Sequence, residues 1–138
     1  MKQKNKFETL SMIKFDQSPR YRKEKRHLVL NMDFVQGSYL GILRGIFDQG
    51  PSWTDTIKKE LLDPESTGVT GEKVDVTITN KQIIIAPELV ENPEELAIEI
   101  DRQTLLDLLK QWEELTAQNY QRITFTRHED GSITLTGE

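Results

Sequence analysis

A strong pattern of apolar and polar positions begins at residue 97. Apolar and polar residues alternate over 97–100, which predicts a strand, and the carboxylate of Asp101 is well suited to cap a following helix. Apolar residues then recur at intervals of three and four, which predicts an amphipathic helix of about four turns. The apolar positions of this helix are Leu105, Leu108, Leu109, Trp112 and Leu115.

Two β-hairpins are predicted by alternation with a period of two. The first joins residues 73–79 to residues 82–86 through a tight turn. In the second, Ile123 and Phe125 alternate with threonines, Gly131 gives the turn its backbone freedom, and the alternation then resumes. Each hairpin therefore has one apolar face. We expect the long helix to cover these faces, which would bury its tryptophan and leucines.

Two further helices are predicted before the hairpins. The first has glycines on one face, where the lack of side chains would allow close packing on a sheet; they are Gly37, Gly41 and Gly45. The second begins at Ser52, which forms a capping-box pattern with Asp55, and it buries a stripe that includes Leu62 before Pro64 ends it. Residues 63–72 are rich in turn-forming residues and are predicted to form a loop.

The order of these elements predicts an α+β fold. We expect one domain with an antiparallel five-stranded sheet and about three helices packed mainly on one face. A chain of 138 residues can bury one core but is short for two domains. No apolar run approaches the length of a membrane span, and no apolar segment with a cleavage site follows the N-terminus. The absence of cysteine excludes disulfides and thiolate metal sites, and a cytoplasmic location is expected.

The net charge of −5 conceals an asymmetry between two parts of the chain. Residues 1–26 hold nine Lys and Arg against three acids, whereas residues 27–138 hold nine basic and twenty acidic residues. We therefore predict a basic N-terminal segment, 1–26, and an acidic α+β domain, 27–138. The segment has a weak apolar pattern at Phe7, Leu10 and Met12, and residues 28–35 alternate as a strand would, although a helix there also fits.

Residues suited to catalysis are few. His27 lies in a basic run and His128 beside the turn of the second hairpin, where polar side chains are usually only solvated. No phosphate-binding glycine loop, paired-histidine zinc motif or serine-elbow motif is present. The sequence therefore predicts a protein that is not an enzyme, with no cofactor and no metal.

Acidic residues are dense over residues 88–114, where nine carboxylates stand against Arg102 and Lys110. Two interpretations are open: a solvated polar surface, or a docking surface for a cationic protein. The candidate docking residues are Glu91, Glu94, Glu95, Asp107, Glu113 and Glu114, with the loop over residues 63–72 as a second possibility.

A family resemblance is carried by three runs in the C-terminal half: IIIAPELV, IDRQTLLDLLKQWEEL and ITFTRHEDGSITLTG. Together they resemble small bacterial immunity proteins of polymorphic-toxin and contact-dependent growth inhibition systems. The resemblance implies a cytoplasmic protein that binds one cognate toxin domain, often a nuclease, and occludes its basic active-site cleft. The strongly acidic body agrees with such a partner, because carboxylates can occupy the positions of phosphates.

Two other functions fit parts of the sequence. The basic N-terminal segment could serve a small regulatory or nucleic-acid-binding protein, which salt-dependent mobility shifts would reveal. The acidic residues could hold magnesium in a hydrolase, which calorimetry with the metal would reveal. Nucleic-acid binding is not favoured, because an acidic body repels phosphates.

Overall fold

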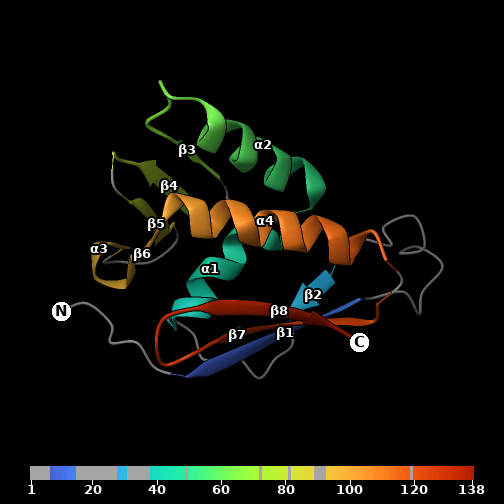
Figure 1. Ribbon diagram of the computed structural model, residues 1–138. Helices are drawn as coiled ribbons and strands as arrows, with labels where there is room; N and C mark the ends of the chain where they lie inside the picture. Colours follow the sequence, from blue (N-terminus) through green and yellow to red (C-terminus); the bar gives the residue numbers. More distant parts are fainter. Residues whose placement is uncertain are drawn as a thin grey trace.

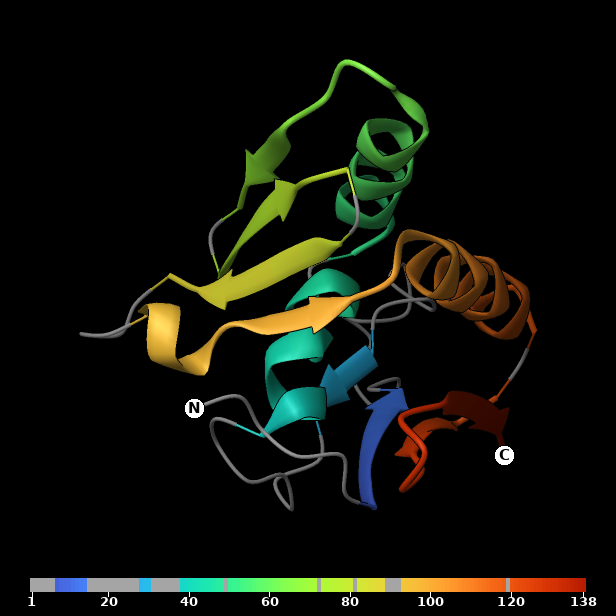
Figure 2. The same cartoon turned by 60° about the vertical axis from the view of Figure 1, so that its left-hand side comes forward.

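The computed structural model describes residues 7–14, 28–30, 38–48, 50–71, 73–80, 82–88, 93–118 and 120–138. Within these residues the chain forms one α+β domain with four helices and two antiparallel sheets (Figures 1 and 2). The strand order is β2-β1-β7-β8 in the first sheet and β3-β4-β5-β6 in the second.

The first sheet joins the two ends of the chain. It consists of β1 (Glu8–Lys14), β2 (Leu28–Leu30), β7 (Arg122–Arg127) and β8 (Ile133–Gly137). β1 lies between β2 and β7, so that Met12 is opposite both Leu30 and Ile123. Leu10 and Met12 are buried, and Met12 is 0% exposed. This part of the basic N-terminal segment therefore belongs to the core, whereas residues 15–26 lie outside the described residues.

The second sheet is local in the sequence. It consists of β3 (Gly68–Thr70), β4 (Val74–Ile78), β5 (Ile83–Pro87) and β6 (Ile98–Ile100). Alternation along β4 and β5 buries every second side chain, as a half-buried strand requires. The sheet therefore has one face packed in the core and one open face.

The helices are α1 (Tyr39–Phe47), α2 (Pro51–Leu62), α3 (Pro93–Leu96) and α4 (Arg102–Thr116). α1 contacts strands of both sheets, and in Figure 1 it lies behind α4. The N-terminus of α1 is capped by the hydroxyl of Ser38, which accepts from Gly41 N, and by the carboxylate of Glu8, which accepts from Leu40 N. Because Glu8 belongs to β1, this cap fixes α1 to the first sheet.

The predicted single five-stranded sheet is wrong. Both predicted hairpins exist, as β4–β5 and β7–β8, but they belong to different sheets. β1 takes the place beside β7, and α1 packs between the sheets instead of on one common face. Two apolar hairpin faces alone do not determine whether the hairpins pair with each other.

The prediction that the long helix buries its apolar side is confirmed for α4. Leu108 is 1% exposed and Trp112 is 5% exposed, and Asp101 caps the helix by accepting from Thr104 N at 3.2 Å. The Trp112 ring lies 5.2 Å from Phe47 and 5.7 Å from Phe125, measured between ring centroids. This aromatic cluster joins α1, α4 and β7, with its rings tilted as aromatic packing favours.

Three details of α2 and its surroundings differ from the prediction. The N-cap is Gly50, with φ of 89° and Pro51 after it, and no side chain caps the helix, so Ser52 does not form a capping box. Leu62, the last helical residue, is 63% exposed. The predicted loop over residues 63–72 contains β3, which pairs with β4.

The predicted close approach of glycine to a sheet is confirmed at Gly45, whereas Gly37 lies outside the described residues. A Cβ added to Gly45 would lie 2.4 Å from Val74 Cγ1, nearer than packed carbon atoms approach. The backbone of Gly45 also makes a hydrogen bond, because Gly45 O accepts from Trp53 Nε1 of α2 at 3.0 Å. α1 is therefore held against β4 at van der Waals distance.

Gly45→Ala should destabilise the domain by about 1–2 kcal/mol, because overpacking outweighs the gain of about 1 kcal/mol in helix propensity. Val74 is β-branched and has little freedom to move aside. The double variant Gly45→Ala/Val74→Ala removes the clash, so its free energy of unfolding should exceed that of Val74→Ala alone. Additive effects in this double-mutant cycle, measured by urea unfolding, would contradict the predicted contact.

Candidate functional site

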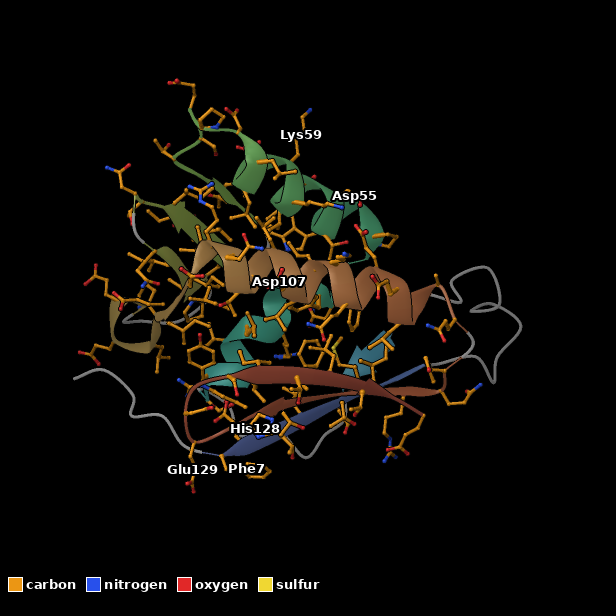
Figure 3. All side chains as sticks on the ribbon, in the orientation of Figure 1. Phe7, Asp55, Lys59, Asp107, His128 and Glu129 are labelled. Atoms are coloured by element: carbon orange, nitrogen blue, oxygen red, sulfur yellow. The ribbon has the colours of Figure 1, made fainter. Side chains whose placement is uncertain are left out.

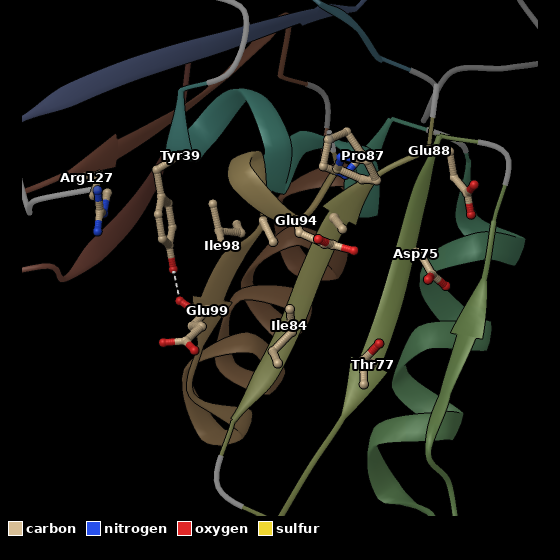
Figure 4. A pocket seen from close by; sticks show the side chains of 13 residues that line it. Tyr39, Asp75, Thr77, Ile84, Pro87, Glu88, Glu94, Ile98, Glu99 and Arg127 are labelled. Atoms are coloured by element: carbon tan, nitrogen blue, oxygen red, sulfur yellow. Dashed lines mark hydrogen bonds between the residues drawn. The ribbon is translucent and has the colours of Figure 1, made fainter. Parts of the chain in front are cut away.

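A groove of about 650 Å³ lies on the open face of the second sheet (Figure 4). The floor of the groove is formed by the residues of β4 and β5 that alternate with the buried ones, because successive side chains of a strand point to opposite faces of the sheet. Asp75 lies opposite Ala86, and Thr77 opposite Ile84, across the β4–β5 pair. The floor is therefore partly apolar and partly polar.

Four carboxylates line the groove from different elements. They are Asp75 on β4, Glu88 after β5, Glu94 on α3 and Glu99 on β6. Asp75 Oδ1 accepts from the Thr70 hydroxyl at 2.7 Å, whereas Glu94 and Glu99 are exposed. In Figure 4 these side chains lie on the near side of the strands, with α2 and α4 behind. The groove therefore concentrates negative charge on residues held by β4, β6, α3 and the end of β5.

One end of the groove is closed by Tyr39 and Arg127. The Arg127 guanidinium carbon lies 3.6 Å from the centroid of the Tyr39 ring, and Arg127 is 5% exposed. The Tyr39 hydroxyl donates to Glu99 O at 2.8 Å. Burial raises the pKa of Tyr39, with Arg127 opposing that rise, so Tyr39 remains a neutral donor at neutral pH. These contacts connect α1, β6 and β7 at the groove.

The structure separates the predicted docking residues into two groups. Glu94 lines the groove, Glu95 is exposed beside it on α3, and Glu91 lies outside the described residues. The other three, Asp107, Glu113 and Glu114, are on α4, which lies behind the sheet as viewed from the groove (Figures 3 and 4). They do not form one surface with the groove.

The carboxylates on α4 differ in their environment. Asp107 accepts from Gln103 Nε2 at 2.9 Å on the exposed side of the helix. Glu113 is half-buried and pairs with Lys58 of α2 at 3.5 Å, whereas Glu114 is exposed. The α4 group thus has three carboxylates beside Lys58, whereas the groove has four beside the buried Arg127, so the groove is the more acidic of the two.

The sequence prediction missed the roles of Tyr39, Asp75, Glu99 and Arg127. Alternation in the first hairpin does predict that Asp75 and Thr77 share a face. Nothing local predicts that this face meets a residue of α1 and another of β7. Those neighbours depend on how the two sheets pack.

The two histidines do not extend the site. His27 lies outside the described residues, and His128 Nε2 lies 3.1 Å from the Thr134 hydroxyl near the β7–β8 turn. In that turn Gly131 has φ of 90°, and Asp130 accepts from Ser132 N and Oγ, which lowers the pKa of Asp130. Among the described side chains, no group of three His, Cys, Asp or Glu could hold a metal ion.

No family model, curated protein or solved structure matches the chain. Of the helices that the structure describes, none has the length and apolar character needed to cross a membrane.

Proposed function

We propose that this protein is an immunity protein that binds a cognate nuclease toxin domain and occludes its basic active-site cleft. The observation that carries the proposal is the acidic groove, in which Asp75, Glu88, Glu94 and Glu99 surround a partly apolar floor. The family resemblance of the C-terminal half suggests the same class of partner. The excess of acidic over basic residues in 27–138 adds a long-range negative electrostatic potential.

The groove is suited to a protruding basic segment of such a partner. Its carboxylates can pair with lysine and arginine side chains that would otherwise hold phosphates of the substrate. Its apolar floor, which includes Ile84 and Ala86, can contact the aliphatic parts of those side chains. Because Asp75, Glu94 and Glu99 belong to helices and strands, their backbone loses little freedom when they bind.

Inhibition of this kind needs no chemistry in the immunity protein. When carboxylates fill the partner's cleft, the backbone of a nucleic acid is excluded because the space is occupied and because the carboxylates repel its phosphates. The attraction between opposite surfaces also accelerates association, which suits a protein that must capture its target quickly.

The test is co-expression with the toxin domain encoded by the adjacent gene, followed by charge reversal in the groove. Glu94→Lys/Glu99→Lys should slow association by about 10-fold to 1000-fold at low salt and abolish growth rescue. Both residues are exposed, so the fold should persist. The matched control is Asp107→Lys/Glu114→Lys on α4, which makes the same change in charge at exposed positions and should retain rescue.

The other outcomes distinguish the alternatives. If only the α4 variant lost growth rescue, the docking surface would be on α4 and not in the groove. Absence of rescue by the wild-type protein, with no complex detected by calorimetry, would overturn the immunity function itself.

A further inference from the structure

Two carboxylates lie at opposite corners of the groove floor. Asp75 of β4 is opposite Ala86 of β5. Glu99 of β6 is opposite Ile84 of β5. Asp75 and Glu99 are therefore two strands apart across the sheet and two residues apart along it, which places their Cα atoms about 12 Å apart at ordinary strand spacings. Figure 4 shows the two side chains on either side of Ile84.

The floor between these two corners is apolar. Ile84 and Ala86 are half-buried and point to the open face of the sheet, because they alternate with the buried residues of β5. An apolar chain lying across them would remove their remaining surface from water, which is favourable. A ligand that matches the floor therefore carries positive charge at both ends and has an apolar middle.

Hydrogen-bond donors are scarce in the lining of the groove. Of the described side chains that line it, only Tyr39, Thr77 and Arg127 carry donors. The Tyr39 hydroxyl donates to Glu99 O, and Arg127 is 5% exposed and lies on the far side of the Tyr39 ring from Glu99 (Figure 4). Peptide carbonyl groups would find few partners here, and burying them unpaired is costly. A ligand whose polar groups are all donors has no such cost.

The spacing of the carboxylates also distinguishes an extended cation from a metal ion. A divalent metal needs several oxygen ligands around one point. Among the described side chains, no group of three His, Cys, Asp or Glu could provide them. The groove instead distributes its four carboxylates over β4, β6, α3 and the end of β5. The positive charge of a matching ligand must be distributed in the same way.

We propose that the groove binds aliphatic polyamines, with one ammonium group at Asp75 and another at Glu99. The methylene chain lies across Ile84 and Ala86. Extended spermidine spans about 11 Å between its terminal nitrogens at standard bond lengths, which matches the diagonal of the floor. A carboxylate accepts several hydrogen bonds at once, so the bond that Asp75 already accepts from the Thr70 hydroxyl leaves room for an ammonium group.

The expected affinity is modest. Glu99 is exposed and Asp75 is half-buried, and ion pairs in such positions are weak and screened by salt. We expect a dissociation constant of about 0.1–1 mM for spermidine at low ionic strength. Added salt should weaken the binding. The binding needs this chain alone, so the proposal does not rest on the proposed function.

Calorimetric titration with cations of different length tests the match at low ionic strength. The unbranched eight-carbon diamine has the span of spermidine and should also bind. Putrescine has the same charge as that diamine but about half its span, so it cannot reach both carboxylates. Octylamine keeps the eight-carbon chain but has only one charge. Putrescine, octylamine and Mg²⁺ should each bind at least about 10-fold more weakly than the eight-carbon diamine.

Two variants with equal loss of charge test the position of the site. Asp75→Asn/Glu99→Gln keeps the shape of both side chains and should weaken the binding of spermidine about 10-fold. The control, Asp107→Asn/Glu114→Gln on α4, removes the same charge and should bind spermidine as the wild type does. Circular dichroism verifies that both variants are folded. Glu99→Gln alone, at an exposed position, serves as the test if the double variant does not fold.

Several results would overturn the proposal. One is a wild-type protein that does not bind spermidine. Another is equal affinity for putrescine and the eight-carbon diamine, since the separation of the two carboxylates would then play no part. Equal weakening in the groove variant and the α4 control would mean that spermidine binds only to the general negative charge. A short peptide with two lysines at the same span that binds more tightly than spermidine would make the groove a peptide site.

Discussion

Trp112→Ala should lower the free energy of unfolding by about 3–5 kcal/mol, the usual cost of deleting a large buried aromatic side chain. The loss combines the transfer of a large apolar surface with a cavity that three elements cannot close. Phe47 and Phe125 both pack on this ring, and they lie 5.1 Å apart themselves. α1 and β7 would therefore both lose part of their contact with α4.

Urea unfolding monitored by circular dichroism measures this effect. Trp112→Phe should cost less, because it keeps an aromatic ring in the cluster. Leu62→Ala, at an exposed position, should change the free energy of unfolding by less than about 0.5 kcal/mol. An unfolding midpoint for Trp112→Ala equal to that of the wild type would mean that α4 does not pack on this cluster.

Met12→Asp should abolish the folded state. The side chain of Met12 is 0% exposed in the middle of β1, so the new carboxylate would be buried without a partner. Such a burial costs about 5 kcal/mol or more, which is comparable with the whole stability of a small domain. The expected result is an insoluble or molten product that shows no cooperative thermal unfolding.

Two variants separate this effect from a general intolerance to change in β1. Thr9→Asp introduces the same carboxylate three residues away on the exposed face, where it should cost little. Met12→Leu preserves apolar volume and should cost less than about 1.5 kcal/mol. A stable, cooperatively folding Met12→Asp would mean that β1 is not part of the core.

Much of the fold could be predicted from local periodicity. The stripe of α4 and the alternation of the two hairpins are long and regular, so their types and burial follow from the spacing of Leu105 to Trp112 and of Ile123 to Phe125. Strand β1 could not be recognised with similar ease. Leu10 and Met12 alternate correctly, but they stand in a segment whose basic composition suggests a solvated tail.

The candidate site could be predicted only in part. The carboxylates themselves are evident in the sequence, but their grouping depends on strand register and on the packing of α1. The count of acids between residues 88 and 114 grouped Glu94 with Asp107, but Glu94 lines the groove and Asp107 is on α4, the helix behind the second sheet in Figure 4. Asp75, outside that window, lies in the groove because β4 pairs with β5.

The position of β1 has a consequence for how the chain folds during synthesis. All four strands of the second sheet lie between Gly68 and Ile100, so that sheet can assemble from neighbouring segments as they emerge from the ribosome. The first sheet cannot be completed until β7 has been made, long after β1; Ser11 and Thr124 are 113 positions apart. Closing so long a loop is entropically costly and slow. Until then the partner of β1 on its β7 side is missing, so Leu10 and Met12 stay partly uncovered, and the nascent chain is most exposed to proteases and to aggregation before the β7–β8 hairpin is released.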